Sequence, residues 1–466
     1  MSSTSSLLTT FPTIQAPLDP QFIPAILANR SYRQAVSDSG TSTNLAIAIE
    51  RENGFISRHD LQIFQPGSQY DADTLRVIDR HIKFLLWAKG GWKIYLSGPT
   101  SFCQAIQEAY SSGGKRDFDT KLMQRVYEQP FTVDIVGAAQ VPDTQEMGAS
   151  VGGHLEGCRI GFDLGASDYK LAAVINGEPL FSTEIRWDPV GQADPAYHYT
   201  RIAEGLKQAA SHMPRVDAIG GSSAGIFIAN QPKIASLFRA IPEKAFDEAI
   251  KPMFLKLQKE WNVPLVIIND GDVTALAGAM SLQQDAMLGI AMGSSEAVGY
   301  LNPEGRITGY LNELAFAPVD FNEQAAIDEW SGDYGVGALY FSQQAVNKLA
   351  PAAGISFPDD ILLPERLKTV QEKANNRDRQ AEKIFETIGV YLGYTLPHYA
   401  EYYDYENLLM LGRVTSGRGG EILLEHAKKV LAQEFPELNE RITLHVPDEQ
   451  SRRVGQAVAA ASLPEI

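Results

Sequence analysis

The sequence predicts an α/β fold in which short apolar strands alternate with helices. Residues 159–174 contain two apolar runs joined by a tight turn, the pattern of two neighbouring antiparallel strands. Residues 265–270 are an apolar run that ends in Asn-Asp and precedes a helix-forming stretch. Residues 407–417 run from an apolar strand into a glycine-flanked turn, and residues 421–434 then have the pattern of a helix. Repeated units of this kind are typical of layered α/β proteins.

Length and composition are those of a globular protein with more than one domain. The chain has 466 residues, of which 44% are hydrophobic and 21% charged. The net charge of −17 argues against a nucleic-acid partner, since binding phosphates needs clustered Lys and Arg. The longest apolar runs are too short to cross a bilayer, and residues 1–10 lack the basic start and apolar core of a secretory signal. We therefore expect a cytoplasmic protein with no membrane and no nucleic-acid partner.

Three zones follow one another along the chain. Residues 1–43 are punctuated by Ser, Thr and Pro and predict an extended N-terminal arm. Residues 44–157 alternate strand and helix signals and contain Asn53-Gly54, a strong hairpin turn. Residues 158–466 form the core that carries the motifs described below.

The middle zone, residues 44–157, repeats in outline the strand–turn–helix order near the C-terminus. It could be a degenerate copy of that unit, or the similarity could be a coincidence of short apolar runs. Its apolar side chains exceed what so small a unit can bury by itself. We therefore expect it to pack on the core as a regulatory or oligomer-forming module. A homo-oligomer is a possible assembly.

The turn Asp163-Leu-Gly165-Ala-Ser167 predicts a phosphate-binding loop. A glycine lets the backbone approach a phosphate closely, and the hydroxyl and exposed amides can bond it. The carboxylate of Asp163 can hold a hydrated Mg²⁺ ion. The alternative is an ordinary hairpin turn, because acidic Gly-Ser turns are common.

Further along the chain, other polar residues follow apolar strands. Asp270 stands at a strand end beside a helix start, where a carboxylate can act as a base, although such an Asp is more often a helix N-cap. A second glycine-hydroxyl turn between two strands is formed by Gly293, Ser294 and Ser295. This turn could bind a further part of the phosphate chain. Gly412 precedes a predicted helix, and the unpaired backbone amides at the N-terminus of a helix can bind a nucleotide.

From about Gly157 to the C-terminus, the order of these motifs resembles the actin-like ATPase (hexokinase-type) superfamily. Within it, the chain is most similar to the sugar kinases of the ROK and glucokinase group. The sequences around Asp163 and Gly293 resemble the family's two phosphate motifs, although the second is usually Gly-Thr-Gly. The strand before Asp270 resembles the one that carries the catalytic aspartate. Glu313 lies in a segment similar to the one that supplies a sugar-binding Glu, and Gly412 in one similar to the adenosine motif.

The resemblance implies a two-lobed actin-like, or ribonuclease H-like, core with an additional N-terminal α/β module. It also implies ATP-dependent phosphorylation of a sugar or sugar-like hydroxyl, with Mg²⁺ as cofactor. Asp270 would accept the proton of the attacking hydroxyl, and Asn269 and Glu313 would bind the sugar. Asp163 would orient Mg²⁺ through water. The nucleotide would contact the two glycine-hydroxyl turns and Gly412.

The chain departs from the family pattern at the sugar site. Phe316 stands where the kinases usually have a His, and Ile327 where they have a second sugar Glu. No Cys-rich loop is present, so we expect no zinc site. These departures leave an alternative function, a nucleotide-binding sensor or degenerate kinase without sugar phosphorylation. A ROK-type transcriptional regulator would need a winged helix that residues 1–43 are too short to form.

Overall fold

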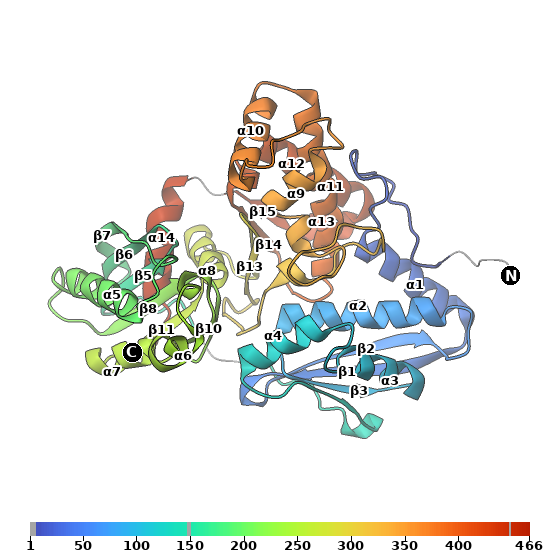
Figure 1. Cartoon of the computed structure of the whole chain (residues 1–466), viewed down its shortest axis with the longest axis horizontal. Coiled ribbons are helices and arrows are strands. Elements are labelled where there is room, and N and C mark those ends of the chain that lie inside the picture. Colours follow the sequence, from blue (N-terminus) through green and yellow to red (C-terminus); the bar gives the residue numbers. More distant parts are fainter. Residues whose placement is uncertain (1–5, 147–150, 447–448) are drawn as a thin grey trace.

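The computed structural model describes residues 6–146, 151–446 and 449–466. Figure 1 shows three groups of elements: a blue-to-cyan N-terminal unit, a green first lobe and a yellow-to-orange second lobe. The last helix, drawn in red, returns to the first lobe. Within these described ranges, no helix is long and apolar enough to cross a membrane.

The first lobe is built on a five-stranded sheet in the order β11-β8-β5-β6-β7. β5, β6 and β7 are antiparallel neighbours, whereas β8 and β11 run parallel to β5. The strands are β5 (Cys158–Leu164), β6 (Asp168–Ile175), β7 (Glu178–Arg186), β8 (Ala218–Ser223) and β11 (Leu265–Asn269). The lobe also contains the hairpin β9 (Ile226–Ile228) and β10 (Gln231–Ile234), and the helices α5 (Pro195–Ala210), α6 (Glu243–Ala245), α7 (Met253–Trp261) and α14 (Glu449–Ala461).

Alternation along β5 explains how both faces of this sheet are covered. Ile160, Phe162 and Leu164 belong to one apolar cluster with residues of α5 and α7. On the other face, a Cβ on Gly161 would lie 1.7 Å from the backbone oxygen of Ala457 in α14. A glycine at this position is therefore required for α14 to pack directly on the sheet.

The second lobe has a four-stranded sheet in the order β13-β12-β14-β15. As in the first lobe, a hairpin (β12 and β13) is followed by strands parallel to its first member. The strands are β12 (Met287–Met292), β13 (Glu296–Leu301), β14 (Asn407–Leu411) and β15 (Thr443–His445). Its helices are α9 (Gln343–Leu349), α10 (Leu363–Asn375), α11 (Arg379–Tyr399), α12 (Gly417–Glu434) and α13 (Pro436–Arg441). The helix α8 (Asp270–Leu282) joins the two sheets.

The N-terminal unit has a sheet in the order β2-β1-β3-β4. Its elements are α1 (Ala25–Ser39), β1 (Ser42–Glu50), β2 (Ile56–Phe64), α2 (Asp71–Lys89), β3 (Lys93–Ser97), α3 (Thr100–Ala109), α4 (Asp117–Tyr127) and β4 (Thr132–Ile135). The hairpin predicted at Asn53-Gly54 is present, with both residues at positive φ. However, β1 is antiparallel to β3, whereas the corresponding strands of both lobes are parallel. Of the two alternatives left open for residues 44–157, a degenerate actin-like copy is contradicted by this pairing, and a coincidence of short apolar runs is favoured.

The prediction of an extended arm over residues 1–43 is also wrong in part, because Ala25–Ser39 is the helix α1. Burial of apolar side chains such as Tyr32 on the helix face decides this, against the Ser-rich local composition. The residues before α1 run along the second lobe. There, Tyr394 accepts a hydrogen bond at 3.1 Å from the backbone of Ile14, and Phe22 packs on Tyr391.

The N-terminal unit and the second lobe share one hydrophobic cluster, to which α1, β1, α2, α11 and β14 all contribute. A buried charge network ties the same two parts together. Asp333 of the second lobe accepts from Arg80 (2.7 Å) and Arg116 (2.7 Å) of the unit. Lys83 lies 3.3 Å from the same carboxylate oxygen. The unit thus packs on the core, as its apolar content predicted.

Candidate active site

Asp163 lies near the carboxyl end of β5 and is almost fully buried. One of its carboxylate oxygens accepts a hydrogen bond from the Ser222 hydroxyl at 2.8 Å, and the other pairs with Lys170 Nζ at 2.9 Å. The turn after it is closed by the Gly165 amide, which donates to the Asp168 carbonyl at 3.0 Å, and Ser167 is exposed. The structure thus gives a tight turn with an anchored carboxylate at its base.

Asp270 is the first residue of α8, directly after β11. The N-cap is Asn269, whose side-chain oxygen accepts from the Gly271 amide at 2.6 Å, so the reading of Asp270 as a cap is wrong. Burial first, and then repulsion from Asp163, raises the pKa of Asp270 to about 6. The two carboxylates are therefore close enough to interact, although they come from different strands.

The side chain of Asn269, predicted to bind sugar, is engaged within the protein. Besides capping α8, it donates from Nδ2 to the Gly225 carbonyl at 2.8 Å. Its role in binding a substrate stays a prediction.

Glu313 precedes a short 3-10 turn (Leu314–Phe316) of the second lobe. Burial first, and then repulsion from Asp270 and Asp272, raises the pKa of Glu313 to about 7. Of the three carboxylates singled out in the sequence, Asp270 thus interacts electrostatically with both Asp163 and Glu313.

The backbone that carries Glu313 is held by the end of α2. The amides of Leu311, Asn312 and Glu313 donate to the last carbonyls of that helix at 3.0–3.3 Å. These carbonyls have no partner within their own helix, so the loop acts as a C-terminal cap. The N-terminal unit thus helps to position a predicted substrate-binding residue.

Two buried polar residues that the sequence reasoning missed support this arrangement. Asp272 accepts from the backbone of Tyr300 at 3.2 Å and from Asn312 Nδ2 at 2.9 Å. Burial, opposed in part by these bonds, raises the pKa of Asp272 to about 7. The Tyr403 hydroxyl donates to the side-chain oxygen of Asn312 at 3.1 Å. The position of Asp272, two residues after Asp270, was the only sequence signal for the pair Asp272 and Asn312.

Glu296 extends the row of carboxyl groups. It begins β13, directly after Ser295, and is 3% exposed. The Tyr399 hydroxyl donates to it at 2.9 Å. Burial, with repulsion from Glu313, raises the pKa of Glu296 to about 8, so the group is largely protonated at neutral pH.

The second predicted phosphate motif and the predicted adenosine motif lie side by side. Gly293 closes the turn after β12 by donating from its amide to the Ser295 carbonyl at 3.0 Å, and both Ser294 and Ser295 are exposed. Gly412 has φ 95°, and a Cβ there would lie 2.3 Å from the backbone oxygen of Met292, the last residue of β12. A side chain at position 412 would therefore separate the two turns.

The departures from the family pattern have structural consequences. The Phe316 ring packs on Trp87 (4.5 Å between centroids) and Phe118 (5.5 Å) of the N-terminal unit. Ile327 is 65% exposed. The adjacent Asp328 accepts from the amide and hydroxyl of Ser331, both at 2.7 Å, so it is used in its own turn.

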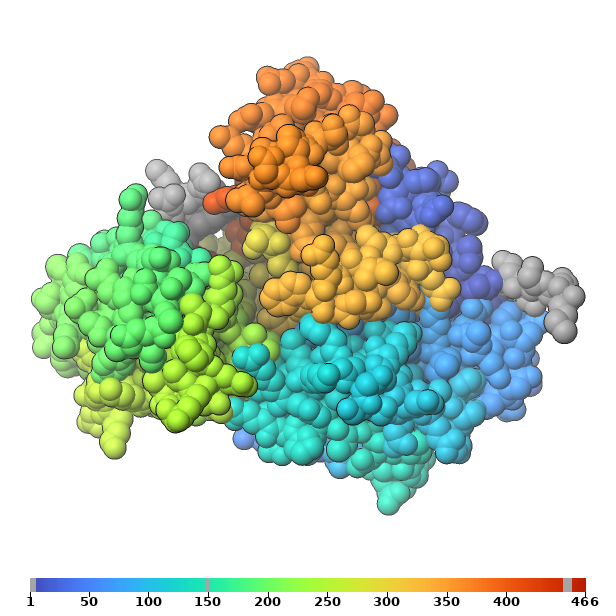
Figure 2. Space-filling model, in the orientation of Figure 1, coloured from blue at the N-terminus to red at the C-terminus, as the bar shows by residue number. Residues whose placement is uncertain are grey.

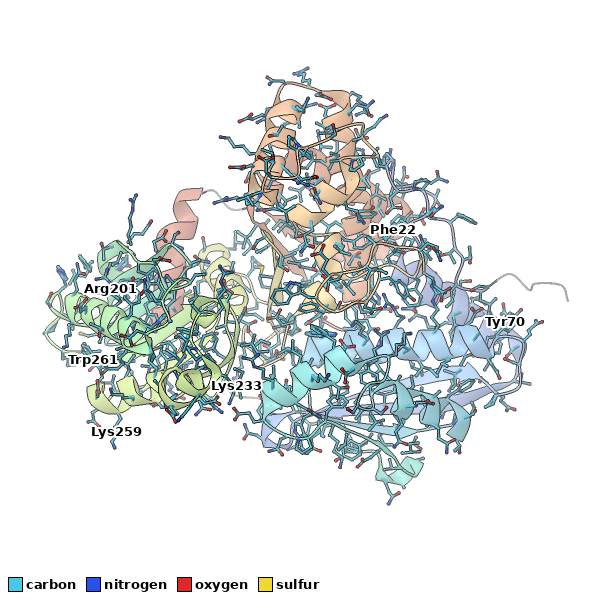
Figure 3. The ribbon with its side chains drawn as sticks, in the orientation of Figure 1. Phe22, Tyr70, Arg201, Lys233, Lys259 and Trp261 are labelled. Carbon is cyan, nitrogen blue, oxygen red and sulfur yellow. The ribbon has the colours of Figure 1, made fainter. Side chains whose placement is uncertain are left out.

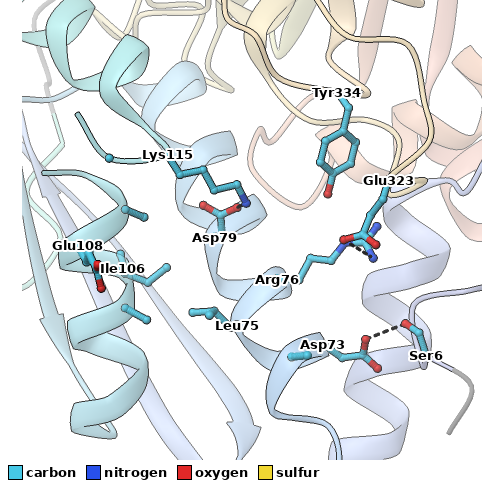
Figure 4. A pocket seen from close by; sticks show the side chains of 14 residues that line it. Ser6, Asp73, Leu75, Arg76, Asp79, Ile106, Glu108, Lys115, Glu323 and Tyr334 are labelled. Carbon is cyan, nitrogen blue, oxygen red and sulfur yellow. Dashed lines mark hydrogen bonds and ion pairs between the residues drawn. The ribbon is translucent and has the colours of Figure 1, made fainter. Parts of the chain in front are cut away.

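A cavity of about 800 Å³ lies away from these carboxylates, between α2, α3 and the second-lobe loop that carries Glu323 and Tyr334 (Figure 4). Four of its charged side chains form ion pairs, Asp79 with Lys115 at 2.8 Å and Arg76 with Glu323 at 3.5 Å. Among the described residues, no group of three or more His, Cys, Asp or Glu side chains is arranged to hold a metal ion.

Comparison with protein-family models and with curated proteins gives no match. Among solved structures, the chain is similar to a ROK hexokinase from Thermus thermophilus, with 17% sequence identity and a TM-score of 0.51 over 65% of this chain and 97% of that one. It is also similar to a ROK family transcriptional regulator, a homolog of the E. coli MLC protein, with 20% identity and a TM-score of 0.53 over 66% of this chain and 79% of that one.

At these identities the likeness concerns the fold alone. The resemblance to ROK proteins is confirmed at that level, and the two lobes described above share the fold of these structures. Because a kinase and a regulator both have this fold, the function has to be argued from the site.

Proposed function

We propose that this protein transfers a phosphoryl group from ATP to a hydroxyl of a sugar or sugar-like molecule. The observation that carries the proposal is that Asp270, at the end of β11, experiences the charge of Asp163 near the end of β5 and acts in turn on Glu313 of the second lobe. A titratable base, an anchored carboxylate and glycine-hydroxyl turns are the parts that phosphoryl transfer to an alcohol requires.

Asp270 is the proposed general base. It is not consumed as a helix cap, and its pKa of about 6 keeps it ionised at neutral pH while leaving it basic enough to accept a proton. In this role its carboxylate accepts the proton of the attacking hydroxyl. Glu313, from the opposite lobe, orients that hydroxyl by hydrogen bonding.

Asp163 is the proposed residue for Mg²⁺, which would neutralise charge on the nucleotide phosphates. Asp163 suits Mg²⁺ because its carboxylate supplies oxygen ligands. A cation there would also relieve the repulsion between Asp163 and Asp270. Magnesium usually binds through one or two carboxylates, water and phosphate oxygens, so it needs no cage of protein ligands. Lys170 fixes the orientation of the Asp163 carboxylate.

Gly165, Ser167, Gly293, Ser294 and Ser295 are the proposed phosphate contacts, and Gly412 lies beside the proposed adenosine site. The exposure of the three serines supports this assignment, although the Ser167 hydroxyl donates to the Asp168 carboxylate at 3.0 Å and would have to exchange that bond for a phosphate. The turns come from different lobes, so a nucleotide bound by both would join the lobes.

A second candidate function is a nucleotide-dependent sensor that binds ATP without phosphorylating a sugar. It is favoured by the apolar packing of Phe316 and by the internal bonds of Asn269, which remove two expected sugar contacts. The two functions share the nucleotide site and differ in whether a sugar is bound and deprotonated by Asp270.

An ADP-release assay with a panel of hexoses, amino sugars and polyols separates the two candidates. The kinase proposal predicts release that depends on one class of these acceptors and saturates with its concentration. A thermal-shift titration provides the control for nucleotide binding. Stabilisation by Mg-ATP with no acceptor-dependent turnover would instead establish the sensor.

A further inference from the structure

The N-terminal unit contacts both lobes, but in very different ways. With the second lobe it shares a hydrophobic cluster and the buried network around Asp333. The apolar cluster of the first lobe, in contrast, has no member from the N-terminal unit among the described residues. In Figure 2 the green first lobe meets the cyan unit along a short boundary.

At this boundary, the carboxylate of Glu128 forms ion pairs with two lysines of the first lobe. Glu128 caps the C-terminal end of α4 in a left-handed conformation (φ 56°), beyond the last turn of the helix. One of its oxygens pairs with Lys233 Nζ at 3.0 Å, and the other with Lys251. Lys233 belongs to β10, and Figure 3 shows it at the edge of the first lobe facing the unit.

These ion pairs are partly shielded from water. The side chain of Lys233 is 6% exposed, and those of Lys251 and Glu128 are 25% and 43% exposed. Burial alone would raise the pKa of Glu128, but the bonds from Lys251 and Lys233 outweigh it and lower the pKa. The pairs therefore stabilise the contact more than a fully exposed pair would.

Because the unit packs rigidly on the second lobe, it must move with that lobe. A change in the angle between the lobes would therefore stretch or break the bonds of Glu128. A contact made of a few ion pairs can break and re-form as the lobes move, whereas the apolar core shared with the second lobe stays packed. Two-lobed enzymes that exclude water from phosphoryl transfer have to adjust this angle in each cycle.

We propose that Glu128 is a positioning residue that latches the N-terminal unit to Lys233 and Lys251 and so fixes the opening between the two lobes. The functional part of this inference rests on the proposed kinase activity. Glu128 touches neither substrate in this account. It acts by setting the distance between the first lobe, which carries Asp163, and the second lobe, which carries Glu313.

The test measures the distance between the lobes in the full-length chain. Spin labels at Lys259→Cys on the first lobe and Lys368→Cys on the second report this distance by pulsed electron resonance, and both native cysteines are buried. In Glu128→Gln the distance distribution should broaden or shift. Asp117→Asn is the matched control, because it removes an exposed ion pair with Lys121 on the same helix.

A charge-swapped variant keeps the test specific. Glu128→Lys should disturb the distance as Glu128→Gln does, and adding Lys233→Glu should restore it at least in part. If Glu128 had a merely structural role, Glu128→Gln would lower the melting temperature but leave the distance between the lobes unchanged, and the charge swap would have no distance to restore. An unchanged distribution in Glu128→Gln would overturn the proposal.

Kinetics provide the second readout. Glu128→Gln should change the sugar KM by roughly fivefold or more, with Asp117→Asn unchanged. The distance measurement requires no turnover. Absence of kinase activity would therefore refute the proposed function without affecting the latch, whereas an unchanged distance would refute the latch alone.

Discussion

The ionisation of Asp270 tests the proposal that this carboxylate is the general base. A base must be unprotonated to act, and burial together with the charge of Asp163 raises the pKa of Asp270 to about 6. We predict that kcat/KM rises with pH to a plateau above about 6, with a slope of one on the acid side. A rate that is flat between pH 5 and 7.5 would contradict this role, once stability over that range has been checked by circular dichroism.

Single residues also show what sequence reasoning could and could not find. Asp163, Asp270 and Glu313 were identified because each follows a recognisable strand or loop pattern in the expected order. Asp272, Asn312 and Tyr403 were missed because the bonds between them join positions 40 and 91 residues apart. No local pattern records such contacts.

At the scale of elements, the sequence predicted strands and tight turns better than helix caps and buried charged residues. The two lobes follow from apolar runs and glycine turns. The helix α1 was missed because contacts with distant elements, and not its Ser-rich composition, stabilise it. The antiparallel pairing of β1 with β3 could not be predicted, since strand direction depends on the path of the chain around α2.

The network around Asp333 provides a prediction for the contact between α2, α4 and the second lobe. Asp333→Asn leaves Arg80, Lys83 and Arg116 short of one buried negative charge. Breaking a buried ion pair on one side costs about 3–5 kcal/mol. We expect a loss of that order in the free energy of unfolding, measured by urea denaturation.

Asp143→Asn is the control for this measurement, because it removes an ion pair with Arg58 in which Asp143 is 96% exposed. That variant should unfold within experimental error of the parent. Equal effects of the two substitutions would show that the Asp333 network contributes nothing specific.

At the scale of the whole molecule, the N-terminal unit is an integral part of the fold. It shares a hydrophobic cluster with the second lobe, and the end of α2 holds the loop before Glu313. We predict that a chain beginning at Gly157 is insoluble or markedly less stable, because it exposes the apolar surface of that cluster. Purification of this chain as a well-folded monomer with full activity would contradict the prediction.

The proposal of phosphoryl transfer depends most directly on Asp270, so its substitution tests the whole account. Asp270→Asn keeps the size and most of the hydrogen bonding of the side chain but removes the base. Acceptor-dependent ADP release should fall by about 10²- to 10⁴-fold, while calorimetry should show nearly unchanged Mg-ATP binding. A variant that phosphorylates the acceptor at the parent rate would contradict the catalytic assignment.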